Sequence, residues 1–550
     1  MHLIPQAKVF EKKEGFLQNL TISLPVAADP RLVKALKKLP VAENGTAVDI
    51  CITGTEGESY TLDIAPDRIT ICAPGTAGAF YAIQTLRQIF AQGDVPCLHI
   101  EDAPSLAYRG FYHDVTRGKV PTLDTLKQLV DRMAYVKLNS LQLYVEHTFP
   151  FKEYGDLPQI CGCLTPEELK ELDDYCKENF IDFIPSLSTF GHLYELLEQP
   201  GYRHLRLCQE PPINRWRGRM MHHTIDPRQP ESIAIIKSLI DQYAPCFTDR
   251  SFNICCDETF DLQEIDPDGS LYVNFVKQII SHTESKGKQV MMWADIALKY
   301  PQQISQLPEN VVFLNWKYSQ DPPEDRVSAL ADRKQILCPG TASWSRMCEN
   351  PIQETGNICA MAKYAKKYHT LGLLNTNWGD WGNPCSLELA MYGLSLGAAV
   401  SWDDTTEPGQ DFDSSVDALI YEHEGGTALL KKLSVLCRHA RWLDLCRLYY
   451  RKRYAYEDQP GRELEEDPAK VTAACTAFAE ELEKQTWKQD EYRQEMIISA
   501  RCTALISGLL AGESVDMLPW LEAFGQKWLE KNKPSELFRI QEMITWLAQN

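Results

Sequence analysis

Two acidic side chains, Asp257 and Glu258, follow the apolar run Asn253-Ile-Cys-Cys in the 550-residue sequence. Neighbouring residues in a regular strand point to opposite faces, so both acids reach one pocket only where the strand gives way to a loop. Two carboxyl groups crowded in a partly desolvated pocket raise the pKa of one, which keeps it protonated for general-acid catalysis. Taken alone, the pair is better explained by a structural role, as a helix N-cap.

The adjacency of the two acids indicates which acid catalysis they would perform. Retaining glycosidases that use a protein nucleophile hold acid and nucleophile about 5–5.5 Å apart, on either side of the anomeric carbon. Adjacent residues flank one carbon in that way only with difficulty. We therefore expect Glu258 to protonate the leaving oxygen and Asp257 to orient a nucleophile that belongs to the substrate. The 2-acetamido group of an N-acetylhexosamine is such a nucleophile.

The acid pair ends one of eight apolar runs between residues 104 and 405. Helix-length segments such as Leu123–Val136 and Pro166–Asn179 separate most of these runs. Near-continuous apolar strands alternating with helices predict a (β/α)8 TIM barrel, whose active site lies at the C-terminal strand ends. A doubly wound parallel sheet is the alternative. The runs are Gly110–Thr116, Ser140–His147, Asp182–Thr189, Phe252–Glu258, Val290–Ala297, Val311–Tyr318, Ile336–Ser343 and Gly372–Gly379.

Four tryptophans stand at or just past the ends of four successive predicted strands: Trp293, Trp316, Trp344 and Trp378. Any one indole is more simply explained as core packing. Four at equivalent strand ends predict instead a pocket whose aromatic walls stack on the apolar face of a pyranose and exclude water.

The segments on either side of the barrel have different patterns. Residues 1–103 predict a small α/β domain, with a hairpin over Tyr60–Ile64 and Arg68–Cys72 and a helix over Gly78–Phe90. Residues 406–550 are charged and predict a helical domain, leaving 104–405 to the barrel. Its helical patterns run over Leu429–Cys437, Ala440–Tyr454, Ala469–Lys484, Glu491–Leu510 and Leu518–Glu530.

Five short motifs occur in one order along residues 104–405. They are Tyr108-Arg-Gly-Phe-Tyr-His-Asp-Val-Thr-Arg117, Met133-Ala-Tyr-Val-Lys-Leu-Asn139, Phe190-Gly-His192, Cys256-Asp-Glu258 and Asn377-Trp-Gly-Asp380. In this order they resemble glycoside hydrolase family 20, the β-N-acetylhexosaminidases. The preceding domain resembles the α/β domain that comes before the barrel in that family.

The resemblance implies a retaining, exo-acting hydrolase of terminal β-linked N-acetylhexosamines, working through an oxazolinium intermediate. Glu258 falls on the general acid/base and Asp257 on the residue that orients the acetamido nitrogen. Arg109 and Asp380 fall on residues that bind sugar hydroxyls, although a barrel-rim salt bridge is the alternative for Arg109. The resemblance further implies that Glu146 and His192 support the acid pair and that the four tryptophans wall the subsite for the terminal sugar.

The chain departs from the family pattern in three places. The tyrosine expected after the strand-seven tryptophan is absent, since Ser345-Arg346 follows Trp344, and Tyr318 is our candidate for its contact with the acetamido carbonyl. The usual Gly-Gly before the acids is Cys255-Cys256. The histidine-rich end of strand two is Leu143-Tyr-Val-Glu146. These changes indicate a divergent branch that resembles the intracellular-type exo-acting N-acetylglucosaminidases of bacteria, and they leave the choice between GlcNAc and GalNAc open.

Two other function classes stay open at this point. One is a barrel glycosidase in which two separated carboxylates perform a double displacement. The other is a catalytically silent sugar-binding barrel, which the intact Asp257-Glu258 pair disfavours.

Composition limits the partners of the chain. There are 56 basic and 76 acidic side chains, a net charge of −20, so a nucleic acid or an anionic membrane would be repelled. A neutral glycan would not be. The N-terminus lacks the order of a secretory signal, and the longest apolar stretch, Ala390–Trp402, is too short to span a membrane. We expect a cytoplasmic protein, with a possible homodimer interface on the C-terminal helices.

Cysteine placement agrees with a reducing compartment, because Cys255, Cys256 and Cys338 lie in apolar runs where free cysteine behaves as a small hydrophobe. The close pair Cys161-Gly-Cys163 has no second pair and no histidines at zinc spacing. We therefore expect no metal there. No glycine-rich phosphate loop appears either, so no cofactor is expected.

Overall fold

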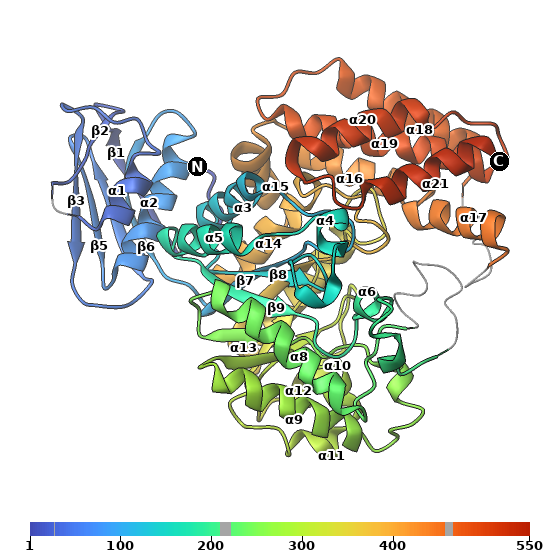
Figure 1. Cartoon of the computed structure of the whole chain (residues 1–550). Helices are drawn as coiled ribbons and strands as arrows, with labels where there is room; N and C mark the ends of the chain where they lie inside the picture. Colours follow the sequence, from blue (N-terminus) through green and yellow to red (C-terminus); the bar gives the residue numbers. More distant parts are fainter. Residues whose placement is uncertain (27, 210–221, 457–465) are drawn as a thin grey trace.

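The computed structural model describes residues 1–26, 28–209, 222–456 and 466–550 and places three regions side by side (Figure 1). The first is a six-stranded sheet in the order β1-β6-β4-β5-β3-β2. The predicted hairpin is confirmed as the antiparallel pair β4 (Tyr60–Ala65) and β5 (Arg68–Ala73). The predicted helix is confirmed as α2 (Thr76–Phe90). The other elements are β1 (Val9–Phe16), β2 (Ile22–Ser23), α1 (Pro30–Leu36), β3 (Thr46–Ile52) and β6 (Pro96–Asp102).

The second region is a closed barrel of eight parallel strands, in the order β10-β11-β12-β13-β14-β7-β8-β9. This confirms the predicted (β/α)8 fold and excludes the doubly wound sheet. All eight predicted strands are present and buried on both faces, as expected where helices cover a parallel sheet. They are β7 (Tyr108–Asp114), β8 (Ser140–Val145), β9 (Asp182–Leu187), β10 (Ser251–Asn253), β11 (Gln289–Trp293), β12 (Val312–Trp316), β13 (Gln335–Cys338) and β14 (Gly372–Asn377).

The strand that leads to the acid pair is much shorter than its apolar pattern predicts. The pattern runs over Phe252–Glu258, but β10 ends at Asn253. Beyond it the backbone leaves the sheet, with left-handed φ angles of 56° at Cys255, 65° at Cys256 and 52° at Glu258. Hydrophobicity therefore continues past the strand into a buried turn, and the acids lie on that turn.

Helices cover the outside of the barrel, and the predicted ones are confirmed as α3 (Leu123–Tyr135) and α5 (Pro166–Glu178). A Thr165/Glu168 capping box begins α5. The long apolar stretch forms α14 (Met391–Trp402), every residue of which is buried. Among the described residues, no helix is both long and apolar enough to cross a membrane. The other long barrel helices are α8 (Pro230–Tyr243), α9 (Ser270–Ser285) and α13 (Pro351–Lys367).

The third region is helical and confirms the pattern predicted for the C-terminal part. Its segment 531–536 runs along the loop that follows β7: Lys533 N donates to Val120 O (2.8 Å) and Glu536 N donates to Gly118 O (3.1 Å). The C-terminal helices are thus joined to the active-site end of the barrel. They are α15 (Gln410–Val416), α16 (Gly426–Cys437), α17 (Trp442–Tyr454), α18 (Pro468–Glu483), α19 (Asp490–Leu510), α20 (Leu518–Lys531) and α21 (Leu537–Gln549).

Arg109 joins the barrel to the N-terminal sheet domain. It is the second residue of β7, at the end of the barrel opposite the active-site face, and its side chain is fully buried. Its guanidinium forms two hydrogen bonds with the Glu58 carboxylate, of 2.8 and 2.9 Å. The structure therefore contradicts the prediction that Arg109 binds sugar hydroxyls. The alternative of a salt bridge is the better description, but it lies at the domain junction and not on the barrel rim.

Glu58→Gln tests this account of Arg109. The change leaves a buried guanidinium without its carboxylate, and we expect the free energy of unfolding to fall by about 2–3 kcal/mol. Chemical unfolding followed by circular dichroism measures the change. Asp49→Asn is the matched control, because it removes the exposed Arg68–Asp49 pair of the same domain. Equal stability of the two variants would contradict a buried structural role for Arg109.

Candidate active site

The two predicted acids lie together on the turn after β10. Asp257 is buried, while the Glu258 side chain keeps 25% of its surface exposed. His192 lies between them, with its Nε2 3.3 Å from Asp257 Oδ2 and 3.3 Å from Glu258 Oε2. The left-handed residues on either side of Asp257 bring both carboxyl groups to one imidazole, which a regular strand would prevent.

His192 has a raised pKa because its ring faces both carboxylates. Burial lowers its pKa, but the charge of Asp257 and hydrogen bonds to Asp257 and Glu258 outweigh burial and raise the pKa to about 10. Its backbone N–H donates to His223 Nδ1 at 2.9 Å, and its own Nδ1 lies 3.4 Å from Arg117 Nη2. Arg117 thus lies on the Nδ1 side of the ring, and Nε2 is the nitrogen that faces the acid pair.

A third carboxyl group, Asp295, supports the turn and was not predicted. It comes just after β11, is buried, and its Oδ2 accepts the backbone N–H of Glu258 at 3.0 Å. Burial, together with the charges of Asp257 and Glu258, raises the pKa of Asp295 to about 7. The contact holds the left-handed backbone of Glu258, where a residue with a Cβ is strained.

The arginine at the active-site end of the barrel is Arg117, three residues beyond β7. Its Nη1 lies 2.8 Å from Asp380 Oδ1 and its Nε 3.3 Å from Glu146 Oε1. The guanidinium lies over the Tyr144 ring, 4.9 Å from the centroid, and over the Trp378 ring at 5.1 Å. Tyr144 Oη donates to Glu146 Oε1 at 2.9 Å. The structure therefore brings Glu146 and Asp380 together around Arg117 and not around Arg109.

Aromatic side chains form the other wall. Tyr318 stacks on Trp316 at 5.2 Å, lies 5.2 Å from Trp344, and its hydroxyl accepts the indole N–H of Trp378 at 2.7 Å. Trp316, Trp344 and Trp378 are half-buried, so part of each indole is accessible. Trp293 differs, because it is fully buried in the barrel interior beneath Trp378, 5.8 Å away. Trp293 therefore lies at the bottom of the pocket, and its ring is not exposed for stacking on a sugar.

Apart from Arg109, the predicted site residues therefore surround one face of the barrel. The unpredicted members are Arg117, Tyr144, His223 and Asp295. Strand direction is the signal that distinguishes the two arginines: Arg109 begins β7, whereas Arg117 follows its C-terminal end. Asp295 carries the same signal, two residues past Trp293. His223 carries none, since it does not stand at the end of a barrel strand.

Comparisons with known proteins agree with this geometry. Residues 106–388 match "Glycosyl hydrolase family 20, catalytic domain", and residues 7–103 match domain 2 of that family. The β-hexosaminidase of Akkermansia muciniphila is 28% identical over 227 residues, covering 37% of this chain and 45% of that one. Hexosaminidase D of Bos taurus is 24% identical over 222 residues, covering 37% and 61%. The chain thus spans about half the length of these curated relatives.

Solved structures share the fold. The chitobiase of Flavobacterium johnsoniae superposes with a TM-score of 0.61 at 18% identity, over 99% of each chain. The β-N-acetylhexosaminidase of Streptomyces coelicolor gives 0.61 at 19% identity, over 76% of this chain and 95% of that one. The catalytic-domain match covers more than half of the residues, together with the acid pair and its barrel. The chain therefore belongs to glycosyl hydrolase family 20.

Proposed function

We propose that this protein is a retaining exo-β-N-acetylhexosaminidase that removes terminal β-linked GlcNAc or GalNAc by substrate-assisted catalysis. The observation that carries the proposal is the shared imidazole: one buried His192 contacts both adjacent carboxyl groups. Two adjacent acids beside one histidine are poorly placed to flank the anomeric carbon from opposite sides. This arrangement favours a nucleophile that comes from the substrate.

In this proposal the two acids divide the chemistry by their exposure. Glu258, the more exposed of the two, protonates the leaving oxygen and later removes a proton from the attacking water. Asp257, which is buried, accepts the N–H of the 2-acetamido group and holds its carbonyl oxygen against the anomeric carbon. The positive charge that develops on the acetamido group as the oxazolinium ring closes lies beside the Asp257 carboxylate, which stabilises it.

The polar group around Arg117 supports recognition of the terminal sugar. Asp380, 37% exposed at its side chain, and Arg117, which it contacts at 2.8 Å, offer an acceptor and donors to sugar hydroxyls. Glu146 and Tyr144 lie beneath them and hold the guanidinium in place. A sugar bound here has its hydroxyls on Arg117 and Asp380 and its reducing end toward Glu258.

The aromatic wall supports binding of the acetamido methyl group. Trp316, Trp344 and Trp378 enclose the apolar side, and Trp293 forms the floor. The Tyr318 hydroxyl accepts one hydrogen bond from Trp378 and also interacts with Thr376, and in this proposal its proton turns to the acetamido carbonyl oxygen when the sugar binds. Tyr318 would then replace the family tyrosine that is absent after Trp344.

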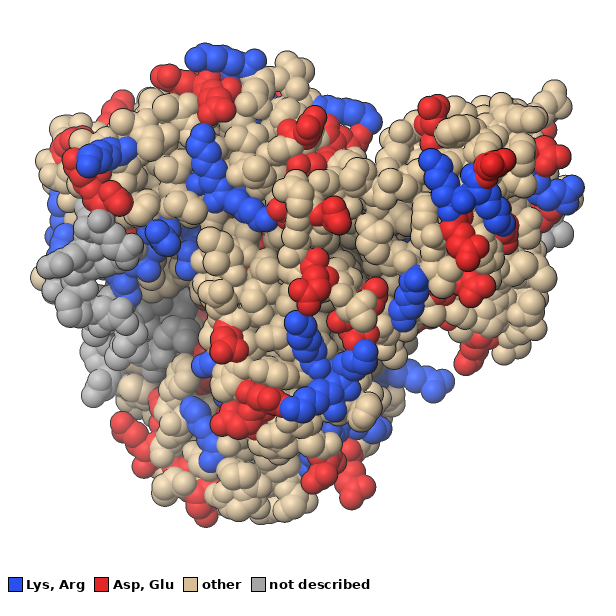
Figure 2. Space-filling view, turned by 180° about the vertical axis from the view of Figure 1, so that it is seen from behind, with Lys and Arg blue, Asp and Glu red and all other residues tan. Residues whose placement is uncertain are grey.

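The proposal also covers the location of the protein, its partners, its domain division and its assembly. All 18 cysteines are free thiols, which supports a cytoplasmic location. The acidic net charge and the interleaved acidic and basic side chains on the face shown in Figure 2 favour a neutral glycan over a nucleic acid or a membrane. We retain the division 1–103, 104–405 and 406–550. Exposed apolar side chains on α20 and α21, at Leu529 and Phe538, are candidate contacts for a homodimer.

Glu258→Gln tests the role of the general acid. General-acid assistance matters least for a good leaving group, so the variant should lose far more activity on natural glycosides than on aryl glycosides. We expect a thiazoline that mimics the oxazolinium intermediate to block the wild type. Initial rates on aryl β-N-acetylglucosaminide and β-N-acetylgalactosaminide measure both effects and the sugar preference. Hydrolysis that resists the thiazoline would favour a double displacement, and binding without turnover would favour a silent sugar-binding barrel.

Asp295 provides a second test, of positioning and not of chemistry. Asp295→Ala removes the acceptor of the Glu258 N–H, and a displacement of Glu258 of about 1 Å would lower kcat on the order of 100-fold. Asp295→Asn keeps an acceptor oxygen of the same shape, so most of the activity should remain. Steady-state kinetics with an aryl substrate separate the two. Equal losses in both variants would show that the negative charge of Asp295 matters and not its hydrogen bond.

A further inference from the structure

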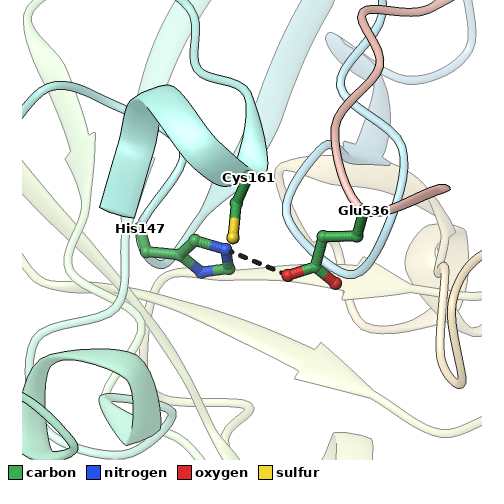
Figure 3. A group of neighbouring side chains, drawn as sticks. All are labelled: His147, Cys161 and Glu536. Atoms are coloured by element: carbon green, nitrogen blue, oxygen red, sulfur yellow. Dashed lines mark ion pairs between the residues drawn. The ribbon is translucent and has the colours of Figure 1, made fainter. Parts of the chain in front are cut away.

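Three buried side chains outside the active site converge where the barrel meets the C-terminal helices (Figure 3). His147 follows β8, Cys161 ends the short helix α4 (Leu157–Cys161), and Glu536 precedes α21. One nitrogen, one sulfur and one oxygen of these residues lie within 4.8 Å of one another. His147 Nε2 is 3.5 Å from Glu536 Oε1, and among the described residues no hydrogen bond of good geometry reaches this nitrogen.

Charged side chains surround the cluster. Two buried carboxylates, Glu195 and Glu536, contact one guanidinium, that of Arg539, at 3.3 and 2.9 Å. Arg539 thus holds the Glu536 carboxylate, whose Oε1 faces His147 Nε2.

We propose that His147, Cys161 and Glu536 bind a Zn²⁺ ion. Imidazole nitrogen, thiolate sulfur and carboxylate oxygen are the three ligand types of protein zinc sites, and a water molecule or the second Glu536 oxygen completes four-coordination. Arg539 Nη2 lies 3.6 Å from Cys161 Sγ, where its N–H donates to the sulfur as outer-shell groups do for metal-bound thiolates. His147 Nδ1 faces Thr116 Oγ1 at 3.4 Å, so Nε2 is the nitrogen directed at the metal.

The ion would join parts of the chain that are far apart in sequence. His147 and Cys161 belong to the barrel, and Glu536 belongs to the segment that runs along the loop after β7. Sequence spacing does not predict this site, because Cys161 is near Cys163 in the sequence but far from Glu536. Cys163 is half-buried and lies outside the cluster, which makes it a matched control.

The experiment measures zinc in protein purified without metal-affinity chromatography, by elemental analysis after gel filtration. We expect about one zinc ion per chain in the wild type and in Cys163→Ser, and its loss in Cys161→Ser and Glu536→Gln. Replacement of zinc by Co²⁺ in the wild type should give a thiolate-to-cobalt charge-transfer band. A strong chelator should lower Tm in the wild type and Cys163→Ser but not in Cys161→Ser.

Metal-free wild-type protein with no cobalt–thiolate band would overturn the proposal. The cluster would then be a proton-holding network of His147, Arg539 and the two glutamates. Hydrolysis of an aryl β-N-acetylglucosaminide by the same samples keeps this result separate from the proposed function. Activity without bound metal refutes only the zinc site, whereas bound zinc without activity refutes only the glycosidase.

Discussion

The turn from Cys255 to Glu258 is the constraint on which the active site depends. Only because β10 stops at Asn253 and the backbone becomes left-handed can adjacent acids meet the same histidine. Left-handed conformations of residues other than glycine cost of order 1–3 kcal/mol each and persist only where surrounding contacts hold them. Here those contacts are the Asp295 hydrogen bond to Glu258 and the burial of both cysteines. Glycine would adopt these positive φ angles without strain, but this chain has cysteine at both positions before Asp257.

Contacts among the barrel residues surround that turn, and the two flanking regions are attached to the barrel. Tyr144 and Arg117 link the acid side of the site to its aromatic side, since Arg117 reaches Glu146, Asp380 and His192 while its guanidinium covers two rings. The N-terminal sheet domain is attached at the opposite end of the barrel, through Arg109. The C-terminal helices are attached beside the loop after β7, close to the site. The C-terminal region therefore lies nearer to the active site than the N-terminal domain does.

Sequence reasoning predicted the barrel, its strands and the acid pair, because these depend on patterns that lie close together in the chain. It misplaced Arg109, since a motif does not say which end of a strand faces the pocket, and Arg117 stood eight residues further along the same motif. It overextended β10, because buried turns and buried strands are equally apolar. It could not find His223 or the partners of Cys161, which come together only through tertiary contacts. Asp295 could have been predicted, because it is an acidic residue two positions past the end of a strand.

The central claim is that the substrate supplies the nucleophile. The most direct measurement is kcat/KM for aryl 2-acylamido glucosides in which the N-acetyl group carries no, one, two or three fluorine atoms. Fluorine withdraws electron density from the carbonyl oxygen, so the account predicts a steep fall in kcat/KM with each added fluorine. A flat series would show that this oxygen does not attack the anomeric carbon, and it would contradict the account.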